Sequence, residues 1–573
     1  MKVETCLPDH NLAQDFEHAF LNGSAFVSVA RWLVVSLCIL FLLLPRESHA
    51  QSAPPQPARK NPSSAAAPST PGSASSSPAK RANPAAPTHI TPEQARQLFS
   101  SVDSILQFDS KVTGLPVLQT VKRRLVTRDE VEQYLMHQLK NDRDAKRLQS
   151  SELVLKKFGL LDRDFQLKPF LIQLLREQIA GYYDDKTKTV NLLDWIPPDE
   201  QKPVLAHELT HALQDQHIHL EKWDRDDDQS IPRNVKQDNE HIATDERDTV
   251  RDAVVEGQAM AVFIDYVLAP SGKTILAAPQ LADKMNEAMG DTSDSPTLAN
   301  APLVLQRSLV FPYIEGLNFV RAVWTAKGKQ AAFAEMLDHP PSSTYEIMNP
   351  TAYLTHAPVP LLRMPDIHSL IDSRYRPYDI GVMGEFDVQV MAELFGGQAA
   401  ADALAPVWRG GIYYTAQSKE ATTTSAKDST ASLALLYLSR WATPQAALAF
   451  ANLYAAEIPR KYDDAVLEPA DDVSAPQGSI TTRTWKTSEG PVLVVVSGKT
   501  VFISESFPVD LARKLQFVMM GSIVDSSTSV AVENRVPQKE LTAGVRHSLF
   551  AFAAPKTLVP PRYTNAGSVL THY

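Results

Sequence analysis

The stretch AHELTHALQDQH, residues 206–217, brings three histidines and a glutamate close together in the chain. His207 and His211 are four residues apart, a spacing that places two side chains on one face of a helix, one turn apart. Two such imidazoles can bind one metal ion, and Glu208 beside the first of them can act as general base on a metal-bound water. The flanking residues are apolar, as expected of a helix buried behind an active site. We therefore predict a metal-binding helix here.

The third ligand has two candidates. His217 lies six residues after His211, but a continuous helix would turn it by about 240° and carry it about 9 Å along the axis. Only a break in the helix would bring it to the metal, and Gln214 stands where a glycine would permit that break. Glu256 lies among apolar residues of a second helical pattern, and buried carboxylates are usually paired or bound to metal. We predict Glu256 as the third ligand, with a fourth position open to water.

The identity of the metal follows from the available ligand types. The chain has two cysteines, Cys6 and Cys38, both before residue 50, so the remainder offers no thiolate. Two histidines and a glutamate suit Zn²⁺. The motif has only three fixed residues and also arises by chance on surface helices, but its apolar flanks favour a functional site.

The amino terminus has the features of an export signal. Residues 32–44 form an apolar run after Arg31, and Ser48-His49-Ala50 offers a small-x-small cleavage site. We expect a signal peptide over residues 1–50, cleaved after Ala50, and an exported protein of the periplasm, cell envelope or exterior. An uncleaved signal would instead tether the protein to a membrane. Residues 51–88 are rich in Pro, Ala and Ser and are expected to form a disordered linker.

Composition limits the classes of partner. The formal net charge is −10, and the sequence shows no Lys/Arg-rich face, so nucleic acid is not an expected partner. A length of 573 residues is enough for two or three folded units.

The remaining pattern predicts an α+β protein. An α-rich domain over residues 89–400 begins with a helix capped by Thr91 and contains a β-hairpin at 181–193. Its other predicted helices are 128–140, 165–180, the helix of the His motif, 243–268 and 313–338. Residues 401–521 mix strands and helices in a smaller α+β domain, followed by an irregular tail over 522–573.

Several motifs together resemble a known family. AHELTHALQDQH, VEGQA around Glu256, FPYIEGLNFV (311–320) and PPSSTYEIMNPTAYL (340–354) are similar to segments of exported bacterial proteins regarded as predicted metallopeptidases. More broadly, the two-helix site resembles the thermolysin-like, or gluzincin, zinc metallopeptidases. The resemblance implies a zincin-like fold for the first domain. The chain departs from the family at Gln258, where an acid is expected, and at Met260, where an Asp is common.

The sequence thus predicts an exported zinc endopeptidase acting on protein or peptide substrates, with Glu208 activating a zinc-bound water. Two alternatives are a catalytically silent envelope binding protein with a structural or vestigial zinc site, and a zinc hydrolase of a non-protein amide. Tyr313, Tyr345 and His356 are candidates for stabilising an oxyanion, but none is assigned to the site, since an aromatic residue in FPYIEG is more often part of the core. The acidic run 224–229 is expected to be a solvated loop.

Overall fold

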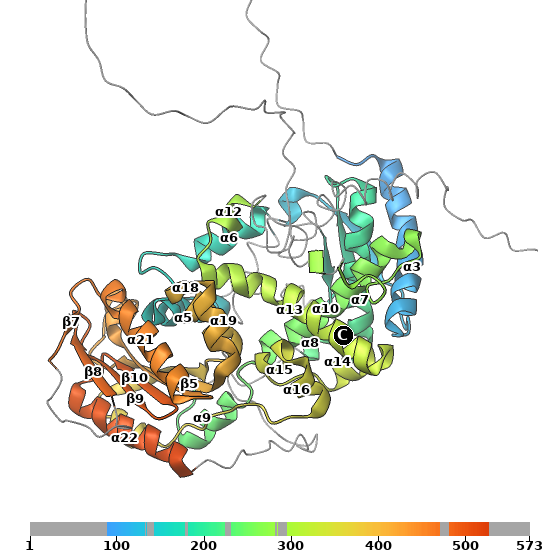
Figure 1. The fold of residues 1–573 in the computed structure, drawn as a ribbon. Coiled ribbons are helices and arrows are strands. Elements are labelled where there is room, and N and C mark those ends of the chain that lie inside the picture. The colour runs from blue at the N-terminus through green and yellow to red at the C-terminus, as the bar shows by residue number, and fades with distance from the viewer. Residues whose placement is uncertain are drawn as a thin grey trace, which may run out of the picture.

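The computed structural model describes residues 89–131, 133, 142–177, 181–223, 231–280, 283–284, 295–469 and 481–525. These residues form a helical half and a sheet half, a mixture of helix and sheet in keeping with the α+β class (Figure 1). The expected signal peptide (1–50), the linker (51–88) and the acidic run at 224–229 lie outside the described residues, as does the part of the expected tail after residue 525. The helix expected at 128–140 also falls mostly outside them.

The helical half contains one small sheet. Its elements are α3 (Pro92–Thr113), β1 (Lys122–Val126), α5 (Asp142–Phe158), α6 (Leu167–Glu177), β2 (Tyr182–Asp184), β3 (Thr189–Leu193), α7 (Pro198–Ile218), α8 (Leu220–Trp223), α9 (Val235–Ile242), α10 (Arg247–Leu268), η1 (Ala269–Ser271), α12 (Pro296–Ala299), α13 (Leu303–Lys327), η2 (Ala331–Glu335), α14 (Met336–Asp338), α15 (Thr344–Met348), α16 (Pro350–Thr355) and α17 (His368–Ile371).

Local signals explain where α3 begins and ends. The Thr91 side chain accepts a hydrogen bond from the Gln94 amide, and the Gln94 side chain accepts one from the Thr91 amide. This capping box satisfies two amides that a helix start leaves free. The helix ends at Gly114, whose φ of 80° is readily adopted only by glycine. The predicted start at Thr91 is confirmed.

The small sheet has the strand order β1-β3-β2. β2 and β3 form the antiparallel hairpin predicted at 181–193, which is confirmed. β1 was not predicted, and it pairs with β3 in parallel. Its sequence, KRRLV, is mostly exposed and lacks the alternation of a half-buried strand, so no local pattern marks it.

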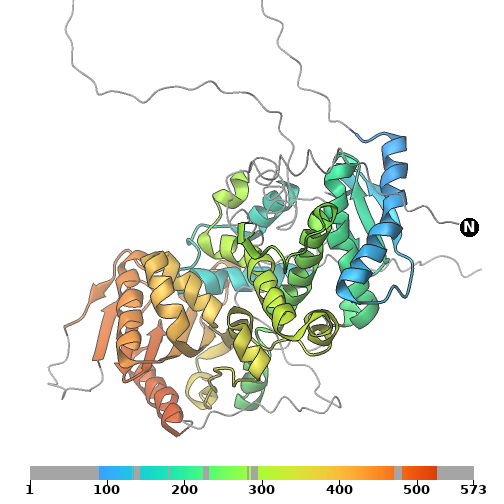
Figure 2. The same ribbon diagram turned by 45° about the vertical axis from the view of Figure 1, so that its right-hand side comes forward.

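α7 packs against this sheet and against α10, and α10 in turn packs against α13 (Figure 2). α10 and α13 cross at two glycines, Gly257 and Gly316. A Cβ added to Gly257 would lie 2.3 Å from the backbone of Gly316, and one added to Gly316 would lie 2.1 Å from the carbonyl oxygen of Ala253. The two helices are thus in backbone contact at a point where no side chain fits.

Among the described residues, the segment Val235–Ser271, which includes α10, is long and apolar enough to cross a membrane. Most of that apolar window is buried inside the protein. The mostly buried core helix of a soluble protein meets the same criteria of length and composition.

Two predicted helices have different bounds in the structure. The helix expected at 313–338 is α13, which ends at Lys327 because Gly328 (φ 85°) follows it. A π-helical turn, η2, and the short α14 come next. The helix expected at 243–268 begins only at Arg247.

The sheet half is built on a seven-stranded sheet of order β4-β5-β6-β10-β9-β8-β7, in which neighbouring strands are antiparallel. Its elements are β4 (Tyr375–Val382), α18 (Glu385–Gly396), α19 (Gln398–Leu404), η3 (Ala405–Val407), β5 (Trp408–Ser418), α20 (Thr424–Lys427), η4 (Thr430–Ser432), β6 (Leu433–Trp441), α21 (Pro444–Lys461), β7 (Val466–Leu467), β8 (Thr481–Lys486), β9 (Val492–Ser497), β10 (Thr500–Glu505) and α22 (Val509–Asp525). Because β4 belongs to this sheet, the boundary expected at residue 400 separates it from the strands with which it pairs.

Both faces of the large sheet are buried. On one face Tyr413 and Val494 belong to the same hydrophobic core as the helical half. On the other face Tyr414 and Val495 pack in a second core with Leu515 of α22. Burial on both faces explains the unbroken apolar run of β9.

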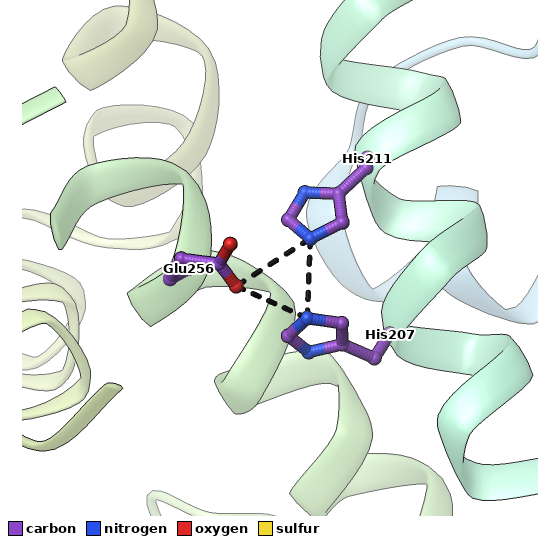
Figure 3. Close-up of side chains that lie close together, drawn as sticks. All are labelled: His207, His211 and Glu256. Carbon is purple, nitrogen blue, oxygen red and sulfur yellow. Dashed lines mark hydrogen bonds and ion pairs between the residues drawn. The ribbon is translucent and has the colours of Figure 1, made fainter. Parts of the chain in front are cut away.

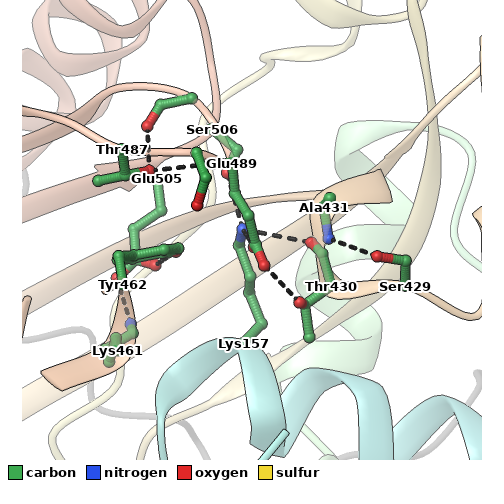
Figure 4. A network of polar contacts seen from close by, with 12 residues as sticks. Lys157, Ser429, Thr430, Ala431, Lys461, Tyr462, Thr487, Glu489, Glu505 and Ser506 are labelled. Atoms are coloured by element: carbon green, nitrogen blue, oxygen red, sulfur yellow. Dashed lines mark hydrogen bonds and ion pairs between the residues drawn. The ribbon is translucent and has the colours of Figure 1, made fainter. Parts of the chain in front are cut away.

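A buried polar network joins α5 to the sheet half (Figure 4). Lys157, near the end of α5, is fully buried. Its Nζ donates to Glu489 Oε2 at 2.9 Å, to Ser506 Oγ at 2.7 Å and to the Thr430 carbonyl oxygen at 3.3 Å. The two halves therefore share polar contacts as well as a hydrophobic core.

Candidate metal centre

Three predicted ligands meet between α7 and α10 (Figure 3). His207 and His211 project from successive turns of α7, and their Nε2 atoms are 3.1 Å apart. Glu256 of α10 points its Oε2 at both, 3.1 Å from His207 Nε2 and 3.5 Å from His211 Nε2. Among the described residues, these three form a group that could hold a metal ion.

The spacing of these atoms suits a small cation. In a tetrahedral zinc site with bonds of about 2.0–2.1 Å, neighbouring ligand atoms lie about 3.3 Å apart. The three observed separations are 3.1, 3.1 and 3.5 Å. Two imidazole nitrogens and a carboxylate oxygen are also the donor types that zinc prefers. The residues present therefore fit the metal that the sequence analysis expects.

The electrostatics of the cluster agree with a site for positive charge. Burial raises the pKa of Glu256, but the neighbouring His211 and His207 outweigh it and bring the pKa down to about 2. Burial lowers the pKa of His211, but the Glu256 carboxylate outweighs it and raises the pKa to about 9. The buried Glu256 carboxylate is thus kept ionised, and its negative charge stabilises a positive charge beside it.

Glu208 is placed beside the cluster by the small sheet. It follows His207 on α7 and is partly exposed, whereas both histidines are buried. Its Oε2 accepts a hydrogen bond of 2.8 Å from the backbone amide of Tyr183, on the edge strand β2. The hairpin predicted from sequence therefore orients the predicted general base.

His217 and His219 lie elsewhere. α7 continues to Ile218, and His217 Nε2 is 3.0 Å from Asp338 Oδ1 of α14. His219 ends the helix with a left-handed φ of 55° and is exposed. The helix does not break before His217, which agrees with the geometric reason for preferring Glu256.

Gln214 has a role that the motif does not predict. In the sequence it marks only the absence of a helix-breaking glycine, but in the structure its side-chain oxygen lies 2.8 Å from His211 Nδ1. The next residue, Asp215, accepts hydrogen bonds from the Tyr183 hydroxyl at 2.8 Å and from Lys188 Nζ at 2.6 Å. Asp215 therefore fastens the hairpin to α7. The spacing of both residues from His211 was visible in the sequence, but their partners were not.

The three candidates for oxyanion stabilisation occupy different environments. Tyr313 is buried in α13, and the Tyr345 ring lies 6.3 Å from that of Trp408. His356 ends α16, is exposed and has a left-handed φ of 53°. His356 is not a member of the His207, His211 and Glu256 cluster.

Comparisons with known proteins add nothing to the evidence from these residues. No protein-family model, no curated protein and no solved structure matches this chain.

Proposed function

We propose that this protein is an exported zinc-dependent endopeptidase of the gluzincin type, with a zincin-like arrangement in its helical half. The observation that carries the proposal is the convergence of His207 and His211 with Glu256 from a separate helix, next to the partly exposed Glu208. Three protein ligands leave a coordination position for substrate or water, which is typical of catalytic zinc sites.

The metal would be held by His207, His211 and Glu256. When bound, zinc would lower the pKa of a coordinated water toward about 7 and polarise the substrate carbonyl. The chain's own contribution is the proton transfer. The Tyr183 amide binds Oε2 of Glu208, so Oε1 is the oxygen that can take the proton from the attacking water. The same carboxyl can then donate a proton to the leaving amine.

An extended peptide is the substrate that the surroundings suit best. β2 is an edge strand of the described sheet and runs directly beside Glu208. Glu208 takes the Tyr183 amide, and the backbone groups that remain on this edge can pair with an extended chain, which provides affinity with little dependence on side-chain sequence. This placement favours a peptide bond over an unrelated amide as the target.

The test is hydrolysis of casein by the purified chain, compared with a Glu208→Gln variant. Gln keeps the shape of the side chain but cannot take a proton, so kcat should fall by about 10²–10⁴-fold. Zinc should remain stoichiometric, because Glu208 does not hold the metal. Activity that survives the substitution in a zinc-loaded preparation would rule out the proposed mechanism.

A further inference from the structure

His211 stands at the end of a chain of two buried side-chain amides. Gln214 and Gln258 are both fully buried. The Gln214 oxygen meets His211 Nδ1 at 2.8 Å, and the Gln214 nitrogen meets the Gln258 oxygen at 2.9 Å. Gln258 is the position at which the sequence departs from the acid expected by family resemblance. The structure puts a neutral amide relay there.

Backbone carbonyls fix the direction of this relay. The Gln258 nitrogen donates to the carbonyl oxygens of Ala332 and Phe333, at 2.8 and 3.0 Å. Carbonyl oxygens only accept hydrogen bonds, so the Gln258 NH₂ must face them and its oxygen must face Gln214. Both carbonyls belong to the π-helical turn η2. π-Helical turns occur often at functional sites.

The hydrogen bonds of Gln214 also fix which nitrogen of His211 carries a hydrogen. The Gln214 nitrogen also donates to the carbonyl oxygen of Val255, at 2.9 Å. Both of its hydrogens are thus committed, and its oxygen is left facing His211. An oxygen can only accept, so His211 Nδ1 must carry a hydrogen. The Nε2 lone pair of a neutral His211 is then directed at His207 and Glu256.

We propose that Gln214 and Gln258 are positioning residues that keep the hydrogen of His211 on Nδ1, so that Nε2 is the nitrogen that binds the metal once it has lost its own proton. This inference rests on the proposed zinc site and adds an account of how that site is prepared. Partners of this kind orient a ligand and keep its free nitrogen basic. The relay also ties the site to the π-helical turn, a segment far from α7 in the sequence.

The second histidine lacks comparable support in the described structure. His207 Nδ1 is buried and has no hydrogen-bond partner among the described atoms. The hydrogen bonds that orient the histidine pair through Nδ1 are therefore those that link His211 to Gln214 and Gln214 to Gln258. Substitutions that weaken these hydrogen bonds should consequently lower the affinity for the metal.

The experiment measures zinc dissociation constants of the full chain by competition with a chromophoric chelator. Gln214→Met keeps the length of the side chain but removes the acceptor, and zinc affinity should fall by about 10–100-fold. Gln258→Met should give a smaller loss, because Val255 still holds Gln214. The double variant should match Gln214→Met, since Gln258 acts only through Gln214.

Gln201 provides the matched control. It is also a buried glutamine of α7, bonded to Leu193 N and O at 3.0 and 2.9 Å and to the Ile196 carbonyl oxygen at 2.6 Å. Gln201→Met should lower the melting temperature of the metal-free protein but leave zinc affinity within about threefold of the parent, because it has no contact with the site.

Two results would overturn the relay. One is a Gln214→Met variant with parental zinc affinity, and the other is a Gln201→Met variant that loses as much affinity as Gln214→Met. The proposed function fails differently, through zinc-loaded protein that shows no Glu208-dependent hydrolysis. A parent chain that binds no zinc would overturn both.

Discussion

At the residue scale, the candidate centre depends on which side chain joins His207 and His211. The sequence offered His217 and Glu256, and in the structure their surroundings differ. Glu256 Oε2 lies within 3.1–3.5 Å of both imidazoles, whereas His217 pairs with Asp338 at 3.0 Å. The difference follows from the helical repeat, since an unbroken α7 cannot present residues 211 and 217 to one ion.

Zinc affinity of two single variants tests this choice. Glu256→Ala removes a ligand and should weaken zinc binding more than about 100-fold, because outer partners alone are worth about 10–100-fold. His217→Ala removes only a partly exposed contact with Asp338 and should leave zinc stoichiometric. Bound zinc is measured after dialysis against a weak chelator. The reverse order, with zinc lost from His217→Ala only, would contradict the proposed ligand set.

At the scale of elements, the crossing of α10 and α13 sets the position of Glu256. Gly257, the next residue after Glu256, lies against Gly316, and neither position has room for a Cβ. The motifs VEGQA and FPYIEGLNFV thus contain the two glycines of one helix contact, Gly257 and Gly316. A glycine is required here by close backbone approach, not by an unusual φ.

Gly316→Ala should force the two helices apart. A Cβ 2.1 Å from the Ala253 carbonyl oxygen cannot be accommodated without backbone movement. We expect a loss of about 1–3 kcal/mol in unfolding free energy, as for overpacked cores, together with weaker zinc binding as Glu256 moves. Denaturant titration and chelator competition provide the two measurements.

Gly521→Ala is the control for that substitution. Gly521 lies on α22, is exposed and has no neighbouring atom within 4 Å of an added Cβ. Alanine should leave zinc binding unchanged and stabilise the protein by about 0.5–1 kcal/mol through its higher helix propensity. If Gly316→Ala behaved like Gly521→Ala, the close crossing would not be the reason for the glycine.

At the scale of the whole molecule, the sheet half and the helical half are packed together. Arg307 of α13 pairs with Glu393 of α18, and Lys157 of α5 reaches Glu489 beyond β8. Burial lowers the pKa of Lys157, although Glu489 opposes that shift. Arg163 also pairs with Glu489. Glu489 would therefore keep a cationic partner if Lys157 were replaced, whereas Lys157 would lose its paired carboxylate if Glu489 were replaced.

Removing the carboxylate should therefore cost more than removing the ammonium. Glu489→Gln leaves the fully buried Lys157 without its nearest counter-charge, and breaking such a pair costs about 3–5 kcal/mol. Lys157→Met leaves Glu489 paired with Arg163 and should cost less. Unfolding free energies from urea titration compare the two variants. Equal losses, or a larger loss for Lys157→Met, would show that Arg163 does not support Glu489.

Part of the molecule was determined by local sequence. The His207/His211 spacing, the apolar flanks of α7, the capping box at Thr91 and the β2–β3 hairpin were all readable because helix and strand repeats span only a few residues. These signals predicted the two clustered histidines and the helix that bears them, and the apolar surroundings of Glu256 in a second helical pattern predicted the third residue. They also indicated the α+β class.

Other features were decided only by tertiary structure. Contacts between residues distant in sequence depend on how whole elements pack, and no local period encodes them. Packing made β1 a strand despite its charged sequence and placed β4 in the second sheet. It also aligned Gln214 with Gln258 and the carbonyl oxygens of η2. The sequence alone therefore determined the histidine pair and its helix, whereas the fold brought Glu256 to it and oriented His211, because both depend on helices packed across the core.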